Sequence, residues 1–148
     1  MAIKKSTGFR NQILTTASVR DIMDLGFIKI YGGAVPATAD AALGSATLLC
    51  TLSDAGGAGG LIMDTVSVDG VLTKDAAQVW QGTNVAGGVA TFYRHVAVGD
   101  TGVLSTTQAR IQGNIAVGNS DMNITAGTTL VNGAPNILNY YQISLPTL

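Results

Sequence analysis

The chain has 148 residues, which fits one domain. Charged residues make up 11% of it, less than half of the roughly 25% found in ordinary soluble domains, and the formal net charge is −1 at pH 7. The eight Lys and Arg residues are scattered, so direct nucleic-acid binding, which needs clustered cations, is not expected. No apolar run approaches the roughly 20 residues of a membrane span, and no apolar segment of a signal peptide follows the N-terminal lysines. So weakly charged a chain suits lasting contact with copies of itself or a partner.

The N-terminal region divides into an arm and a helical segment. Residues 1–8 carry two adjacent lysines and small polar residues, and we predict a mobile or partner-bound arm there. From Phe9 onward apolar residues recur at helical spacing, and Gly26 is a natural helix stop. A helix is therefore expected over residues 9–25. Ser18, with an acid three positions later, resembles an N-cap, so this region is expected in one piece or two.

After Gly26 the apolar period changes to two, the period of β-strands. No helical pattern lies between the strands, which excludes parallel βαβ units. We therefore predict a mainly β fold over residues 9–148: a single antiparallel β-sandwich domain, jelly-roll-like, with one N-terminal helical region. The expected strands, separated by turns rich in Gly, Asn and Asp, cover residues 27–31, 46–53, 61–68, 77–81, 89–98, 109–117, 128–131 and 137–145.

Residues 77–98 hold the chain's only Trp and only His, and they read as two strands joined by a Gly-rich connection, that is, a hairpin. Arg94 and His95 are adjacent in the second strand, so they point to opposite faces. We expect His95 to be a structural hydrogen-bonding residue. An unpaired buried arginine costs several kcal/mol, so Arg94 should reach a subunit contact, a backbone acceptor or an acid such as Asp64, Asp69 or Asp75.

The triplet Asp100-Thr101-Gly102 resembles the active-site motif of homodimeric, retroviral-type aspartic proteases, in which two carboxylates share one proton. Gly99 and Val103 depart from that pattern, which has an apolar residue before the Asp and a small Ala after the Gly. A loop after a strand accounts for the same residues. A homodimeric aspartic protease is therefore kept only as a remote alternative.

No other motif predicts an enzyme, a metal or a cofactor. The single cysteine, Cys50, lies in an apolar strand-like run, which indicates a buried structural thiol. One His without a Cys/His cluster does not make a metal site. The glycine run at 56–60 lacks the Gly-Lys-Ser/Thr ending of a P-loop, and no Gly-x-Ser-x-Gly elbow accompanies His95.

Four ordered segments carry a resemblance to a known group of proteins: residues 26–33, 37–53, 69–96 and 110–133. Together, over about residues 8–146, the chain resembles small virion proteins of tailed bacteriophages, and in particular capsid decoration, or cementing, proteins with a jelly-roll-like sandwich. The resemblance implies no enzyme activity and no cofactor. It implies a structural protein on the capsid surface, made in the host bacterial cytoplasm, that stabilises the capsid by clamping neighbouring capsid subunits.

The implied partners are the major capsid protein and further copies of the chain, with a dimer favoured and neither nucleic acid nor membrane involved. A tail, baseplate or head-fibre component is the alternative, because the same composition would serve it. The arm and an exposed sheet edge are the expected contact regions. The residues expected to touch capsid or neighbouring subunits are Ile3, Lys4, Lys5, Phe9, Arg10, Trp80 and Arg94.

Overall fold

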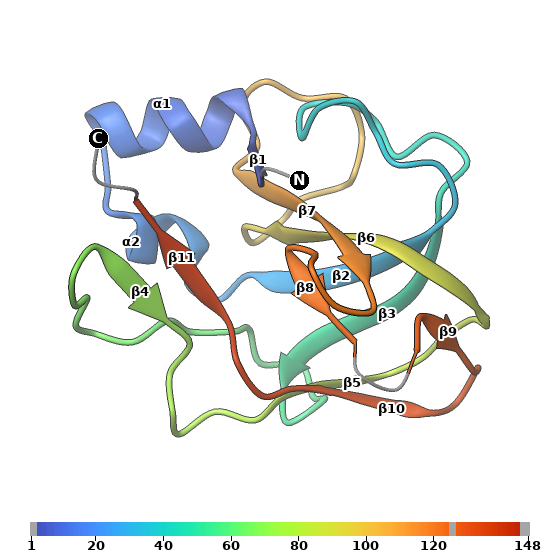
Figure 1. Ribbon diagram of the computed structural model, residues 1–148. Coiled ribbons are helices and arrows are strands. Elements are labelled where there is room, and N and C mark those ends of the chain that lie inside the picture. Colours follow the sequence, from blue (N-terminus) through green and yellow to red (C-terminus); the bar gives the residue numbers. More distant parts are fainter. Residues whose placement is uncertain (1–2, 125–126, 146–148) are drawn as a thin grey trace.

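The computed structural model describes residues 3–124 and 127–145 of the chain. Within these residues the protein is mainly β and antiparallel, with two helices near the N-terminus, α1 (Thr7–Thr15) and α2 (Val19–Met23), which confirms the predicted fold class (Figure 1). The jelly-roll arrangement itself stays a prediction. The strands are β1 (Lys4–Lys5), β2 (Phe27–Gly32), β3 (Thr47–Asp54), β4 (Val71–Thr73), β5 (Trp80–Thr83), β6 (Gly88–Val96), β7 (Arg110–Ala116), β8 (Met122–Asn123), β9 (Thr129–Leu130), β10 (Pro135–Leu138) and β11 (Gln142–Ser144).

The strands form one large sheet and one small one. The large sheet has the order β1-β7-β6-β2-β3-β5-β10, with β8 also paired to β7 and β9 to β6, and β4 pairs with β11 in the small sheet. All pairs are antiparallel except β7 with β8. The predicted hairpin over residues 77–98 is wrong, because β5 pairs with β3 and β10 whereas β6 pairs with β2, β7 and β9. Gly82 permits this arrangement, since a Cβ there would overlap the Thr51 carbonyl of β3.

The register of the large sheet places two different rows of side chains on its two faces. Ile111, His95, Ile28 and Leu52 lie side by side on one face. This face meets the small sheet and both helices in the main hydrophobic core. The next row, on the opposite face, consists of Lys4, Gln112, Arg94, Lys29 and Thr51.

The predicted N-terminal arm is wrong for the described residues 3–8, apart from Ile3, which precedes the first strand. Lys4 and Lys5 pair with Gln112 and Ile111 as an edge strand, and the Ser6 main-chain N–H donates to the Arg110 carbonyl over 2.9 Å. Ser6, whose hydroxyl caps α1, is buried. Residues 1–2 lie outside the described part.

The helical region comes in two pieces. α1 starts at Thr7, two residues earlier than expected, and α2 follows the predicted Ser18 cap with a complete capping box formed with Asp21. α2 ends at Met23, and Leu25 has a φ of 63° before the chain enters β2.

Two predicted strands differ from those observed. Residues 61–68 contain only isolated bridges, at Leu61, Met63 and Val68, because the side chains of this run do not alternate cleanly between buried and exposed. Residues 137–145 divide into β10 and β11, which belong to different sheets. The break between these two strands lets Tyr141 enter the core, where it is 7% exposed.

Candidate functional site

Asp100 and Arg110 form a buried ion pair on the face of the large sheet opposite the main core. The Arg110 Nε donates to the Asp100 carboxylate, and both side chains are almost fully inaccessible. The guanidinium also donates to main-chain carbonyls of two covering loops: Val103 at 2.8 Å, and Ala39 and Asp40 at 3.3 Å each. Arg110 therefore fastens loops 33–46 and 97–109 to β7.

Arg94, next to this ion pair, is 1% exposed and forms no ion pair with an acid within the described part of the chain. Its Nε donates to Gln112 Oε1 over 2.9 Å, and its Nη2 donates to the carbonyls of Ala41 at 2.9 Å and Thr38 at 3.3 Å. Burial, and secondly repulsion from Arg110, lower the pKa of Arg94 below its usual range. The expected pairing with Asp64, Asp69 or Asp75 is wrong, whereas the expected backbone acceptors are confirmed.

The Asp100-Thr101-Gly102 segment is built as a turn. The Gly102 N–H donates to Asp100 Oδ1 over 2.7 Å, and the other carboxylate oxygen faces Arg110. Asp40 has a similar task, since it accepts from the Thr7 N–H at 2.8 Å and from the Thr7 hydroxyl at 2.7 Å. The geometry thus gives both carboxylates hydrogen bonds that hold loops and a helix start in place.

A buried aromatic cluster lies on the other face of the sheet. The Tyr141 hydroxyl is 3.1 Å from His95 Nδ1, and the Trp80 Nε1 donates to Gln78 Oε1 over 2.8 Å. Burial lowers the pKa of His95 to about 3, against a smaller opposing effect of the Met23 main chain, and burial raises the pKa of Tyr141. The hydrogen bond confirms the structural role predicted for His95. Cys50 is a buried free thiol, as predicted, and burial raises its pKa.

Three of the residues expected to contact partners lie inside the molecule. Phe9 and Trp80 are 0% exposed and Arg94 is 1% exposed, so these predictions are wrong: their side chains fill the layers on either side of the sheet. Ile3 is 41% exposed and Arg10 is exposed. Lys4 and Lys5 are half-buried on the edge strand β1. The predicted contact set therefore divides into interior residues and residues near the N-terminus that a partner can reach.

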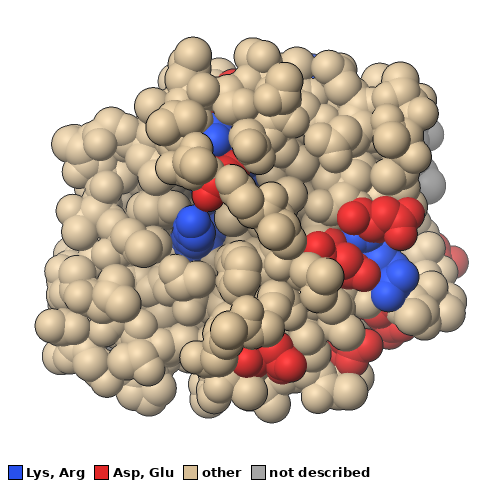
Figure 2. Space-filling view, turned by 180° about the vertical axis from the view of Figure 1, so that it is seen from behind, with Lys and Arg blue, Asp and Glu red and all other residues tan. Residues whose placement is uncertain are grey.

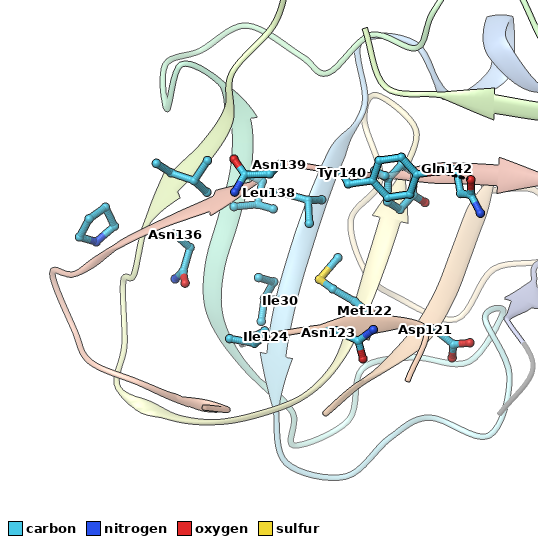
Figure 3. A pocket seen from close by; sticks show the side chains of 14 residues that line it. Ile30, Asp121, Met122, Asn123, Ile124, Asn136, Leu138, Asn139, Tyr140 and Gln142 are labelled. Atoms are coloured by element: carbon cyan, nitrogen blue, oxygen red, sulfur yellow. Dashed lines mark hydrogen bonds between the residues drawn. The ribbon is translucent and has the colours of Figure 1, made fainter. Parts of the chain in front are cut away.

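A cleft of about 580 Å³ lies between two segments that the sequence pattern did not predict to line a common site. One wall is residues 121–124, around β8, and the other is residues 135–142, from β10 towards β11. Figure 3 shows the Met122 side chain pointing from the 121–124 wall into the space, with Ile30 near it, whereas Asn139 and Gln142 lie along the upper wall. Leu52 completes the apolar base.

The cleft continues towards the N-terminus as a smaller groove of about 250 Å³. This groove shares Asp121, Tyr141 and Gln142 with the cleft and extends between Lys5 on β1 and Ser144 on β11. We call the two spaces together the seam, bounded by Ile3, Lys5, Ile111 and residues 121–124 on one side and by residues 135–144 on the other. One sequence feature accompanies it: no charged residue occurs after Asp121.

The surface carries few charges and many apolar side chains. Figure 2 shows charged residues in a few small groups, with wide uncharged areas between them. Large hydrophobic side chains that are more than half exposed include Leu14, Leu25, Val66, Val68, Val85, Val89, Val98, Val103, Leu104, Val117, Val131, Ile137 and Leu145. These apolar side chains are spread over many segments of the chain, from α1 to just after β11, and only a contiguous group of them would mark a contact surface.

Two further features of the described residues, and the comparisons with other proteins, complete the description. Residues 3–124 and 127–145 contain no group of three or more His, Cys, Asp or Glu side chains placed to hold a metal ion. None of their helices has the length and apolar character needed to cross a membrane. Comparisons with protein-family models, with curated proteins and with solved structures found no match.

Proposed function

We propose that this chain is a structural protein of a tailed-phage virion, which decorates the capsid and clamps neighbouring capsid subunits. The observation that carries the proposal is the placement of its polar side chains. Arg94, Arg110, Asp100 and His95 are all inside, holding loops and core together, whereas the outer surface is weakly charged and studded with apolar residues. The resemblance of residues 26–33, 37–53, 69–96 and 110–133 to small virion proteins supports the choice of a phage particle in this proposal.

The mechanics of a clamp fit this architecture. A decoration protein occupies many equivalent sites, so each contact needs only modest area, because the copies act together on one shell. It must also keep its shape under load. The buried guanidinium groups of Arg94 and Arg110 fix two long loops to the central sheet through five main-chain carbonyls, those of Thr38, Ala39, Asp40, Ala41 and Val103. Such networks of several hydrogen bonds make a framework rigid, and among the described residues Arg94 Nη1 is the one guanidinium nitrogen of the two arginines without a partner.

The test is reconstitution on purified particles. Capsids assembled without this chain are mixed with the purified protein, and bound copies are quantified together with the temperature at which the shells break open. We expect saturable binding at a fixed number of copies per capsid subunit and a higher breaking temperature. Purified tails serve as the parallel sample: binding to tails alone would show a tail component instead, and binding to neither particle would end the proposal.

A further inference from the structure

We infer that the seam is an acceptor site for one extended polypeptide segment, which a capsid subunit supplies as an added β-strand. This inference rests on the proposed function for the identity of the donor. Its physical basis is the edge of each strand that lines the seam: β10 pairs only with β5, β11 only with β4, and β8 only with β7. Each of the three has one side without a partner strand among the described residues.

The hydrogen-bond pattern shows which main-chain groups face outward on β11. The Lys74 N–H donates to the Tyr141 carbonyl and the Leu145 N–H donates to the Gly70 carbonyl. Since antiparallel strands alternate, Tyr141, Ile143 and Leu145 direct their main-chain groups towards β4. Gln142 and Ser144 therefore direct their N–H and C=O groups away from β4, and both residues line the smaller groove of the seam.

The same argument applies to β10. The Asn84 N–H donates to the Ala134 carbonyl, which makes 134 and 84 a hydrogen-bonded pair, and the register continues with Asn136 opposite Gly82. Ile137 consequently directs its N–H and C=O away from β5. Pro135, which has no N–H, also falls on this outward side, a position where proline costs no ladder bond.

The composition of the seam wall also supports the docking of an added strand. Soluble proteins protect free strand edges with charges, especially Lys, with proline, with bulges or by keeping the edge strand short. Residues 122–145 contain no charge, and the carboxylate of Asp121 accepts a 2.9 Å hydrogen bond from the Asn114 N–H. The seam strands are short and Pro135 stands on the edge of β10, but the edge carries no charge, and beside a cleft of about 580 Å³ with an apolar base it matches an extended backbone as its occupant.

The expected occupant has a definite chemistry. Its main chain bonds the outward groups of Ile137, Gln142 and Ser144, and its alternate side chains enter the cleft. Because the base is formed by Ile30, Leu52 and Met122, the inward side chains should be apolar and uncharged. A segment of the capsid subunit with an apolar residue at every second position meets these requirements.

The test uses the double variant Gln142→Lys with Ser144→Lys on full-length protein and capsids lacking this chain. Both side chains are exposed and line the groove, so the free protein should fold normally, which a melting curve checks. The control, Val66→Lys with Val68→Lys, adds the same two charges at exposed positions outside the seam. We expect the seam variant to bind capsids at least about tenfold more weakly, because an added strand would bury the new charges, and the control within about twofold of the original chain.

A second measurement does not depend on the variants. Hydrogen exchange of the original chain, free and bound to capsids, reports on the amides of Ile137, Gln142 and Ser144. We expect these three amides to become protected on binding. If the original chain binds capsids while both double variants bind equally well, or while the three amides exchange as fast as in the free protein, the seam inference is overturned and the decoration proposal stands. If the original chain does not bind capsids, both fall.

Discussion

Asp100 forms the buried ion pair with Arg110, so a substitution of Asp100 tests whether this pair stabilises the fold. Asp100→Asn keeps the size of the side chain but leaves the Arg110 guanidinium buried without a counter-charge. We expect the free energy of unfolding in urea to fall by about 3–5 kcal/mol, the usual cost of removing one partner from a buried ion pair. Asp69→Asn, at an exposed turn, is the control and should change it little. Equal effects of the two substitutions would mean that the pair does not hold the loops.

His95 predicts how stability depends on pH. Its pKa is about 3 in the folded protein because of burial, and about 6.5 in the unfolded chain. The unfolded chain therefore binds the proton first, so His95 contributes its full stability above pH 6.5 and loses it as the pH falls towards 3. The expected slope is about 1.4 kcal/mol per pH unit.

The measurement is denaturant unfolding between pH 7 and 5, where few carboxyl groups titrate. Since His95 is the only histidine, His95→Gln should be less stable at pH 7 but show a flat profile over this range. A slope that persists in the variant would show that another group is responsible.

At the scale of elements, the two helix caps differ in what they bond: within the described part of the chain Ser18 bonds only within its own helix start, whereas Ser6 also bonds residues next to and in β7. Ser18 caps α2 at the surface, and Ser18→Ala should cost about 1 kcal/mol. The Ser6 hydroxyl oxygen accepts from the N–H groups of Phe9 at 3.1 Å and Arg110 at 2.9 Å and donates to the Gln108 carbonyl at 2.8 Å. Ser6→Ala should cost about 2–3 kcal/mol, because it also leaves a buried Arg110 N–H unsatisfied. Urea unfolding of both variants measures the two losses in the free energy of unfolding. Equal losses would contradict the stabilising role of the hydrogen bond from the Arg110 N–H to Ser6.

Sequence reasoning found the strands with clean alternation but missed what covers them. Residues 109–117 alternate as β7 does, yet the polar side chains of Arg110 and Gln112, expected opposite the apolar face, are as buried as Ile111. Their cover consists of loops 33–46 and 97–109, which have no periodic pattern to read. The alternation of apolar and polar residues therefore could not predict that β7 is buried on both faces.

The pairing of strands was harder to predict than their presence. The Gly-rich connection after β5 reads as a hairpin turn, but it instead carries the chain to another part of the sheet. Residues 137–145 alternate as one strand would, and only the packing of Tyr141 beside His95 and Trp80 explains the break. The seam arises from where strand edges end in space, so no local pattern marks it. One sequence signal, the absence of charge after Asp121, accompanies it.

For the whole molecule, the distribution of charge predicts a weak response to salt. Arg20 and Asp24 form the one partly exposed ion pair among the described residues, at 3.2 Å, whereas Asp100 and Arg110 are shielded from solvent. Raising NaCl from about 0.05 to 0.5 M should therefore change the free energy of unfolding by less than about 1 kcal/mol. Thermal unfolding across this series measures it. A steep loss of stability with salt would reveal surface electrostatics that the structure does not contain.

The pairing of β1 with β7 sets an order of events during synthesis. Ser6 bonds to Gln108 and Arg110, more than 100 residues further along the chain, so the N-terminal strand has no partner until the ribosome has released three quarters of the polypeptide. β2 and β3 are close in sequence and can pair much earlier. Docking of β1 and α1 is therefore a late step of folding, and a nascent chain carries its N-terminal segment unattached for most of its translation.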